Sequence, residues 1–127
     1  MAGPGPRLAM ERLKNRPDFL RAAKGIRRVT PSITLEVCET PSVAAKPDVL
    51  RVGFTASRKI GGAVQRNRAK RRLRAAAVSV LPLLGHPGND YVLVARRDTL
   101  TRPFGGLLDD LASALHAAHA RLGRSIA

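Results

Sequence analysis

The sequence is poor in acidic residues and has none over a long central stretch. Asp and Glu number 9 against 23 Lys and Arg, which gives the 127-residue chain a formal net charge of +14. No carboxylate lies between Asp48 and Asp90, although Arg and Lys are dense from Arg51 to Arg74. Such an uncompensated charge favours a polyanionic partner, either nucleic acid or an anionic membrane surface.

Cysteine and long apolar runs are also scarce. The single cysteine, Cys38, excludes an intramolecular disulfide and a cysteine-rich zinc site, and it favours the reducing cytoplasm. No apolar run approaches the roughly 20 residues that span a bilayer. The N-terminal residues MAGPGPRLAMER lack the apolar segment of a signal peptide. We therefore expect a cytoplasmic protein that is neither exported nor inserted into a membrane.

Aromatic residues make up only 3% of the chain, and Trp is absent, whereas apolar residues make up 44%. The length suits one domain with one core, built mainly from Ala, Val, Leu and Ile. Periodicity and turn residues predict helices over 15–24, 63–80 and 103–122 and strands over 32–39, 49–57 and 91–97. This order predicts an α+β fold in which one helix crosses between two strands.

The predicted domain organisation is simple. We expect a flexible N-terminal tail over residues 1–12, a single RNA-binding α+β domain over 13–122, and a C-terminal tail over 123–127.

The central helix carries the segment RNRAKRRLR, from Arg66 to Arg74. A helical step of 100° per residue gathers small apolar side chains on one narrow arc and basic side chains over most of the rest. A helix that is only solvated usually interleaves Glu with Lys, and this one does not. A membrane-surface helix needs bulky apolar residues on its inner face. Contact with nucleic acid phosphates is the better interpretation. The arc is formed by Ala69, Leu73, Ala76, Ala77 and Val80.

The choice between DNA and RNA is not made by composition. The basic helix follows a strand through Gly61 and Gly62, without the spacing of a helix-turn-helix motif. Extensive base stacking is also excluded, because the chain has only four aromatic residues, of which Phe54 is expected in the core. They are Phe19, Phe54, Tyr91 and Phe104.

The run RVGFTASRKIGGAVQRNRAKRRLR, from Arg51 to Arg74, resembles the signature of the bacterial ribonuclease P protein component. LKNRPDFLRAAKG resembles the first-helix segment of that family, and DYVLVARR resembles its last strand. The resemblance covers residues 13–122. Within the signature the matching residues are Arg51, Val52, Gly53, Ser57, Arg58, Lys59, Gly61, Ala63, Arg66, Asn67, Arg68, Lys70, Arg71 and Arg74.

The resemblance implies a protein subunit, monomeric when isolated, that binds the catalytic ribonuclease P RNA. Together they remove the 5′ leader of precursor tRNA, with the active site and its Mg²⁺ ions held mainly by the RNA. It also implies a small mixed β-sheet with flanking helices, a ribosomal S5 domain 2-like fold with a left-handed βαβ crossover. Such a hand is rare, since about 98% of these connections are right-handed.

The resemblance also assigns two groups of site residues. The group expected at the leader-binding cleft is Phe19, Arg58, Lys59, Arg96 and Arg97. The group expected to face the catalytic RNA is Arg66, Asn67, Arg68, Lys70, Arg71 and Arg74. For Phe19, a place in the core is the alternative. Ala23 stands where the family usually has a second aromatic residue, so we expect fewer stacked bases in the cleft.

The residues themselves indicate no active site in the protein. His116 and His119 lack a third metal ligand at suitable spacing, and we expect them at the solvent-facing side or edge of their helix. Asp109 and Asp110 are adjacent, so on a helix they point about 100° apart and cannot act as a paired acid and base. The alternatives are a non-catalytic RNA- or ribosome-associated protein and a protein-only nuclease, which would need clustered carboxylates for Mg²⁺.

Overall fold

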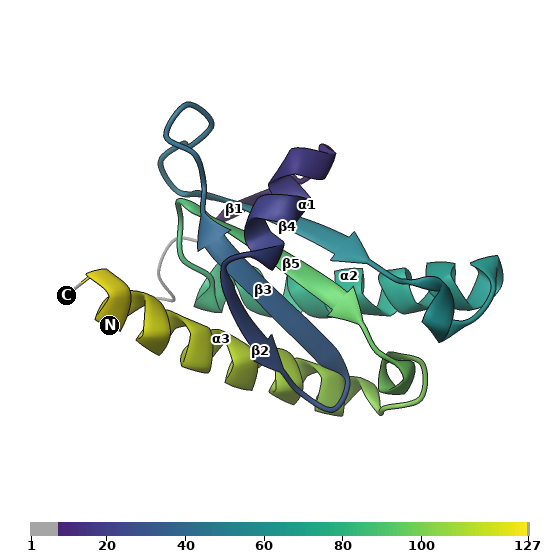
Figure 1. The fold of residues 1–127 in the computed structure, drawn as a ribbon. Coiled ribbons are helices and arrows are strands. Elements are labelled where there is room, and N and C mark those ends of the chain that lie inside the picture. The colour runs from purple at the N-terminus through teal and green to yellow at the C-terminus, as the bar shows by residue number, and fades with distance from the viewer. Residues whose placement is uncertain (1–7, 127) are drawn as a thin grey trace.

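The structure, a computed structural model, describes the backbone of residues 8–126 and the side chains of residues 8–122. These residues form one five-stranded mixed sheet flanked by helices (Figure 1). Two short 3₁₀ turns lie at Arg58–Ile60 and Arg97–Thr99. The strands are β1 (Ala9–Arg12), β2 (Ile26–Val29), β3 (Ile33–Glu39), β4 (Val49–Thr55) and β5 (Asn89–Ala95). The helices are α1 (Arg16–Ala23), α2 (Ala63–Leu84) and α3 (Phe104–Ile126).

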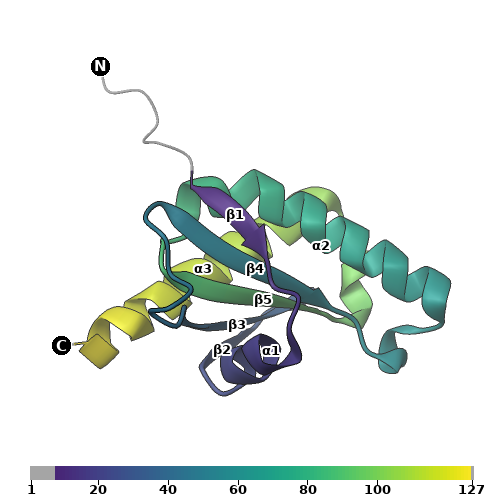
Figure 2. The same cartoon turned by 90° about the horizontal axis from the view of Figure 1, so that it is seen from above.

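The strand order is β1-β4-β5-β3-β2, with β1, β4 and β5 parallel and β3 antiparallel to both β5 and β2. Helix α1 lies on one face of the sheet, and α2 and α3 lie on the other (Figure 2). In Figure 1 both β4 and β5 point to the right, β4 lies above β5, and α2 passes behind them. The β4–α2–β5 crossover is therefore left-handed. The α+β class and the crossover implied by the resemblance are both confirmed.

The main core lies between the sheet and the pair α2 and α3. Strand β4 contributes Leu50, Val52 and Phe54, which alternate with residues facing α1. The small side chains on the inner arc of α2 let the helix approach the sheet closely, because they add little volume between the two backbones. The predicted arc is confirmed, since all five of its residues are buried, and so is the core position of Phe54.

The prediction of a flexible N-terminal tail is wrong for Ala9–Arg12, which form β1; residues 1–7 lie outside the described residues. The short segment AMER lacks a clear alternating pattern, so only its pairing with β4 makes it a strand. At its two ends, the Ala9 N–H donates to the Asp48 carbonyl at 3.0 Å and the Leu13 N–H donates to the Val52 carbonyl at 2.9 Å.

Strand β2 was not predicted either, because IRRV is too short to show a period. It pairs with β3 across a turn that the Thr30 hydroxyl closes by donating to the Ile33 carbonyl at 2.7 Å. The predicted C-terminal tail from residue 123 is wrong as far as Ile126, where α3 ends; residue 127 lies outside the described residues. The last helix is thus longer than its apolar pattern indicated.

Candidate nucleic-acid interface

The first candidate surface is the outer side of α2, which we call the α2 basic surface. The chain enters it through a corner at Gly61, whose φ of 144° lies in the region that favours glycine. Its inner arc is used for packing, so the basic side chains turn outward, either exposed or half-buried. The surface consists of Arg66, Asn67, Arg68, Lys70, Arg71 and Arg74, which are the six residues expected to face RNA.

The α2 basic surface has no counter-charge within the described part of the chain. The cations that form ion pairs among the described residues are Arg21, Lys46, Arg51 and Arg102, and none of them lies on α2. A shallow hollow of about 480 Å³ lies along the helix between Val64 and Arg74. Because like charges at this spacing repel one another, the surface is suited to an external polyanion.

One cation of this surface is held by an aromatic ring. The Arg74 guanidinium carbon lies 5.9 Å from the centroid of the Phe54 ring, and that of Arg12 on β1 lies 5.2 Å from it. Phe54 is only 7% exposed, so it packs in the core and presents its ring to two guanidinium groups. The missed strand β1 therefore extends the basic region beyond α2.

The second candidate surface, here called the sheet groove, lies on the face of the sheet that carries α1. It has a volume of about 720 Å³. The strand register shows why it forms there: one row across the sheet consists of Thr55, Val94, Thr34 and Val29, and α1 does not extend over it. The groove is lined by Arg27, Val29, Thr34, Ser57, Lys59, Ile60, Val94, Ala95, Arg96 and Arg97.

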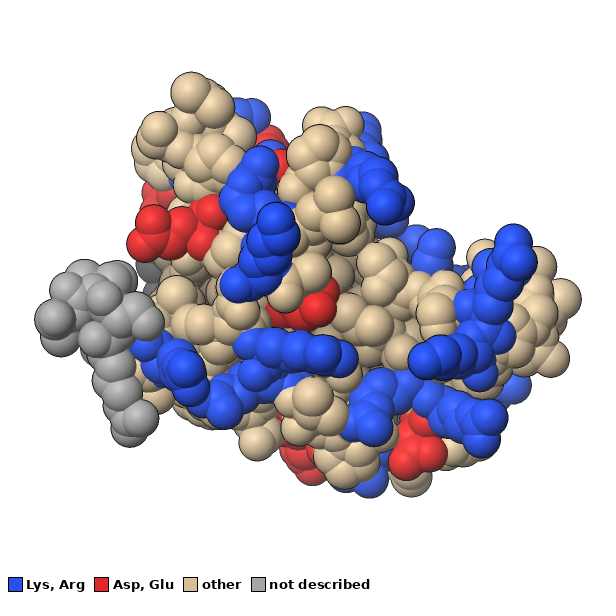
Figure 3. Space-filling model, viewed as in Figure 1, with Lys and Arg blue, Asp and Glu red and all other residues tan. Residues whose placement is uncertain are grey.

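The structure brings three of the expected cleft residues, Lys59, Arg96 and Arg97, into the sheet groove and leaves two outside its lining. Arg58 is exposed on the adjoining 3₁₀ turn. Phe19 of α1 lies on the same face of the sheet, against Gly53 in the row next to the groove. Figure 3 shows Lys and Arg side chains along the lower edge and around the right-hand end of this face.

Phe19 packs directly on the backbone of β4. A Cβ atom added at Gly53 would lie 2.5 Å from the Phe19 ring, so glycine is the residue that leaves room for it. The ring packs against the small apolar cluster of Leu13, Ala22 and Val92 while remaining partly exposed. Phe19 is thus both a packing residue of α1 and an accessible ring beside the groove.

An ion-pair network holds α1 against this face of the sheet. The Arg51 guanidinium donates to Asp90 at 2.8 and 2.7 Å and to Asp18 of α1 at 3.1 Å, and Arg21 donates to Asp18 at 2.8 Å. The hydrogen bond from Arg21, with the nearby Arg51 charge, lowers the pKa of Asp18 despite its burial. The hydrogen bond to Asp90 raises the pKa of Arg51, so Arg51 and Asp18 are both held in their charged forms. The network sets the position of Phe19.

Comparison with known proteins shows the family of the chain. The family model described as Ribonuclease P matches residues 9–119. The chain belongs to the ribonuclease P protein family. It is 52% identical over 109 residues to the ribonuclease P protein component of Ruegeria pomeroyi, covering 85% of this chain and 86% of the relative. It is 49% identical over 117 residues to that of Caulobacter vibrioides, covering 92% and 76%.

Solved structures of the ribonuclease P protein family have the same fold. The protein from Staphylococcus aureus superposes with a TM-score of 0.66 at 25% identity, over 84% of this chain and 94% of that one. The protein from Thermotoga maritima superposes with a TM-score of 0.66 at 24% identity, over 83% and 94%. Membership makes the chain the protein component of an endoribonuclease complex whose partner is ribonuclease P RNA.

The features that resemble the ribonuclease P family now have physical reasons. Arg51 joins the sheet to α1, Gly53 admits the Phe19 ring, and Gly61 turns the chain into α2. Sequence reasoning missed the groove residues Arg27 and Val29, because β2 was not predicted. The signal that could have found them is the short apolar–basic–basic–apolar run IRRV before the turn at 30–32.

The polar residues of α3 differ in their burial. His116 is exposed, as expected, whereas His119 is partly buried and its ring stacks on His86 with centroids 3.6 Å apart. Asp109 is exposed and Asp110 is buried, which confirms that they point apart. Over the described residues, no three His, Cys, Asp or Glu side chains are grouped as a metal site requires. No helix in this part of the chain is long and apolar enough to cross a bilayer.

Proposed function

We propose that the chain binds the catalytic RNA of ribonuclease P through the α2 basic surface and the single-stranded 5′ leader of precursor tRNA along the sheet groove. The single observation that carries the proposal is that no carboxylate among the described residues forms an ion pair with the α2 basic surface. Uncompensated arginines at helical spacing are suited to a rigid, phosphate-rich partner.

The relative placement of the two surfaces supports two RNA partners at once. The α2 basic surface lies on one side of the sheet, and the groove beside α1 lies on the other (Figure 2). An extended strand of RNA fits a groove that offers Lys59 and Arg97 for phosphates, and Phe19 beside it for a base. The leader would then contact one face while the folded catalytic RNA contacts the other.

The protein's chemical contribution would be charge neutralisation and substrate positioning. Under this proposal the Mg²⁺ ions that activate water and stabilise the leaving oxygen are held mainly by RNA phosphates. The arginines of α2 would lower the repulsion between two RNA molecules, so that less free Mg²⁺ is needed. Hydrolysis of the phosphodiester bond would thus take place on the RNA, and the isolated protein would act as a monomeric accessory subunit.

Reconstitution tests the proposal. The protein is combined with a bacterial ribonuclease P RNA at low Mg²⁺, and cleavage of precursor tRNA is measured with and without it. We expect a large stimulation and a mature 5′ end at the natural position. No stimulation would leave a non-catalytic RNA- or ribosome-associated protein as the better description. Cleavage by the protein without RNA would instead indicate a protein-only nuclease.

A further inference from the structure

Phe104, the first residue of α3, is the most exposed aromatic residue of the chain. Its side chain is 40% exposed, whereas Phe54 and Tyr91 are buried and Phe19 is partly covered. It follows Pro103 and precedes Gly105, where an added Cβ atom would meet nothing within 4 Å. The exposed part of Phe104 is open to a partner.

The Phe104 ring borders a hollow whose other walls come from α2. The hollow has a volume of about 330 Å³, and its lining contains three arginines and no carboxylate: Arg68, Arg71, Arg72 and Ala75, with Phe104. Arg68 and Arg71 belong to the α2 basic surface, so the hollow continues that surface toward α3. Ala75 is small, which leaves space beside the ring for a flat group.

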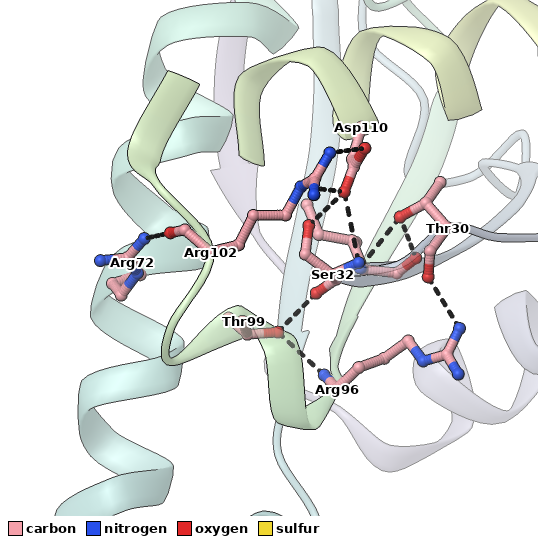
Figure 4. Close-up of polar contacts among 8 residues, drawn as sticks. Thr30, Ser32, Arg72, Arg96, Thr99, Arg102 and Asp110 are labelled. Atoms are coloured by element: carbon pink, nitrogen blue, oxygen red, sulfur yellow. Dashed lines mark hydrogen bonds and ion pairs between the residues drawn. The ribbon is translucent and has the colours of Figure 1, made fainter. Parts of the chain in front are cut away.

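The segment before Phe104 is held rigidly. Arg72 donates a hydrogen bond to the Arg102 carbonyl and so ties α2 to the start of α3 (Figure 4). The Arg102 guanidinium pairs with Asp110 at 2.8 Å. Asp110 accepts from the Ser32 hydroxyl at 2.6 Å, and the Ser32 carbonyl accepts from the Thr99 hydroxyl at 2.5 Å. These bonds connect α2, α3, the turn before β3 and the 3₁₀ turn at Arg97–Thr99.

A glycine makes room for this support. A Cβ atom added at Gly106 would lie 2.7 Å from Nε of Arg102, so a larger residue would require the Arg102 side chain to shift. These bonds hold the backbone just before Phe104 against α2, so an exposed ring lies beside three cations. A backbone held in this way favours binding, because less chain entropy is lost when a ligand stacks on the ring.

We propose that Phe104, Arg68, Arg71 and Arg72 form a pocket for one unpaired base of an RNA. The base stacks on the Phe104 ring, and the guanidinium groups of Arg68 and Arg71 bind the phosphates on either side of it. The pocket rests on the proposed function, since it extends the surface assigned to the catalytic RNA. It lies on the side of the sheet away from the groove, so the base belongs to the catalytic RNA and not to the tRNA leader.

The test measures binding of the full-length protein to a bacterial ribonuclease P RNA. Phe104→Ala should weaken binding roughly 5- to 150-fold, the range of one lost stacking platform. The salt dependence of binding should remain unchanged, because no phosphate contact is lost. Phe104→Tyr should restore wild-type affinity, and Phe104→Leu should not, although leucine keeps an apolar residue at the helix start.

Leu83→Ala is the matched control. Leu83 is an exposed apolar residue, as Phe104 is, but it lies on α2 outside the hollow. Equal affinities of wild type and Phe104→Leu, with unchanged thermal unfolding, would overturn the pocket and leave the proposed function standing. The reconstituted holoenzyme is also assayed for binding of precursor and mature tRNA. If Phe104→Ala weakens only the binding of precursor tRNA, the ring contacts the leader and the pocket is overturned. Failure of the wild type to bind the RNA would instead refute the proposed function itself.

Discussion

The two candidate RNA surfaces are built in different ways. The α2 basic surface consists of residues close together in one helix, and no carboxylate of the described residues pairs with them. The sheet groove takes residues from three strands and two 3₁₀ turns, and one of its cations, Arg96, already donates to the Thr30 carbonyl at 2.7 Å. The first surface is local and electrostatic, whereas the second depends on tertiary structure.

This difference predicts that distant substitutions should damage the groove before they damage α2. The ion-pair network around Arg51 is the clearest place to separate the two surfaces. It contacts α1 and the sheet but no residue of α2.

The largest effect is expected for Arg51→Ala. It should lower the free energy of unfolding by about 3–5 kcal/mol, because it leaves a buried carboxylate without its partner. Asp90 is fully buried, and Arg51 supplies two of its hydrogen bonds. Urea unfolding measures the change. Lys46→Ala is the control, since the Lys46–Glu11 pair is exposed and should contribute less than about 1 kcal/mol. Equal losses in the two variants would contradict a structural role for Arg51.

A smaller and more specific effect is expected for Phe19→Ala. In the holoenzyme it should weaken binding of precursor tRNA by about 1–3 kcal/mol, the contribution of one stacked base, and change binding of mature tRNA little. Competition binding with the two RNAs measures the difference. Leu20→Ala, at the exposed neighbouring position, should leave both affinities unchanged. An equal loss for both RNAs, together with lower stability, would make Phe19 a packing residue only.

The same contrast explains which features of the structure could be predicted from the sequence. The inner arc of α2, from Ala69 to Val80, was predicted correctly, since helical periodicity is a property of neighbouring residues. The core position of Phe54 was also predicted, because its strand has apolar neighbours. Strand β1 was not predicted, because it exists only through its pairing with β4, which is distant in the chain. Strand β2 was not predicted, because it is too short to show an alternating pattern.

The strand residues of the groove could not be predicted for the same reason. Arg27, Thr34 and Val94 share one face only because of the register between β2, β3 and β5, and no local pattern contains that register. Arg51 was noticed only as part of the motif. Its bond to Asp90, 39 positions away, follows from the parallel pairing of β4 and β5.

The α2 basic surface is tested by its salt dependence. Replacing both Arg66 and Arg68 with Ala should reduce the slope of log affinity for ribonuclease P RNA against log salt by about two, because two phosphate contacts are lost. Lys24 and Lys46, which are exposed elsewhere, give the matched double variant with the same change of charge. An unchanged slope in the Arg66 and Arg68 variant would show that these side chains do not touch phosphates.

The smallest effect concerns His119 on α3, which belongs to neither surface. The backbone N–H of His86 donates to the Tyr91 hydroxyl oxygen at 2.8 Å, and that hydroxyl lies 2.8 Å from Nε2 of His119. The Tyr91 hydrogen is therefore best donated to a neutral His119 ring. Burial, followed by the charges of His86 and His116, lowers the pKa of His119 to about 4.

Because this value lies below the ordinary histidine pKa of about 6.5, the unfolded chain takes up the proton first as the pH falls. Stability should thus decline from pH 6.5 toward pH 4, by about 1 kcal/mol once partial exposure is allowed for. His119→Gln should remove this part of the pH dependence in urea unfolding, and His116→Gln, at an exposed position, should retain it. Since protonation of His119 affects the whole fold, both RNA affinities should decline together with the folded fraction. Loss of leader binding alone would show that the groove unfolds before α2.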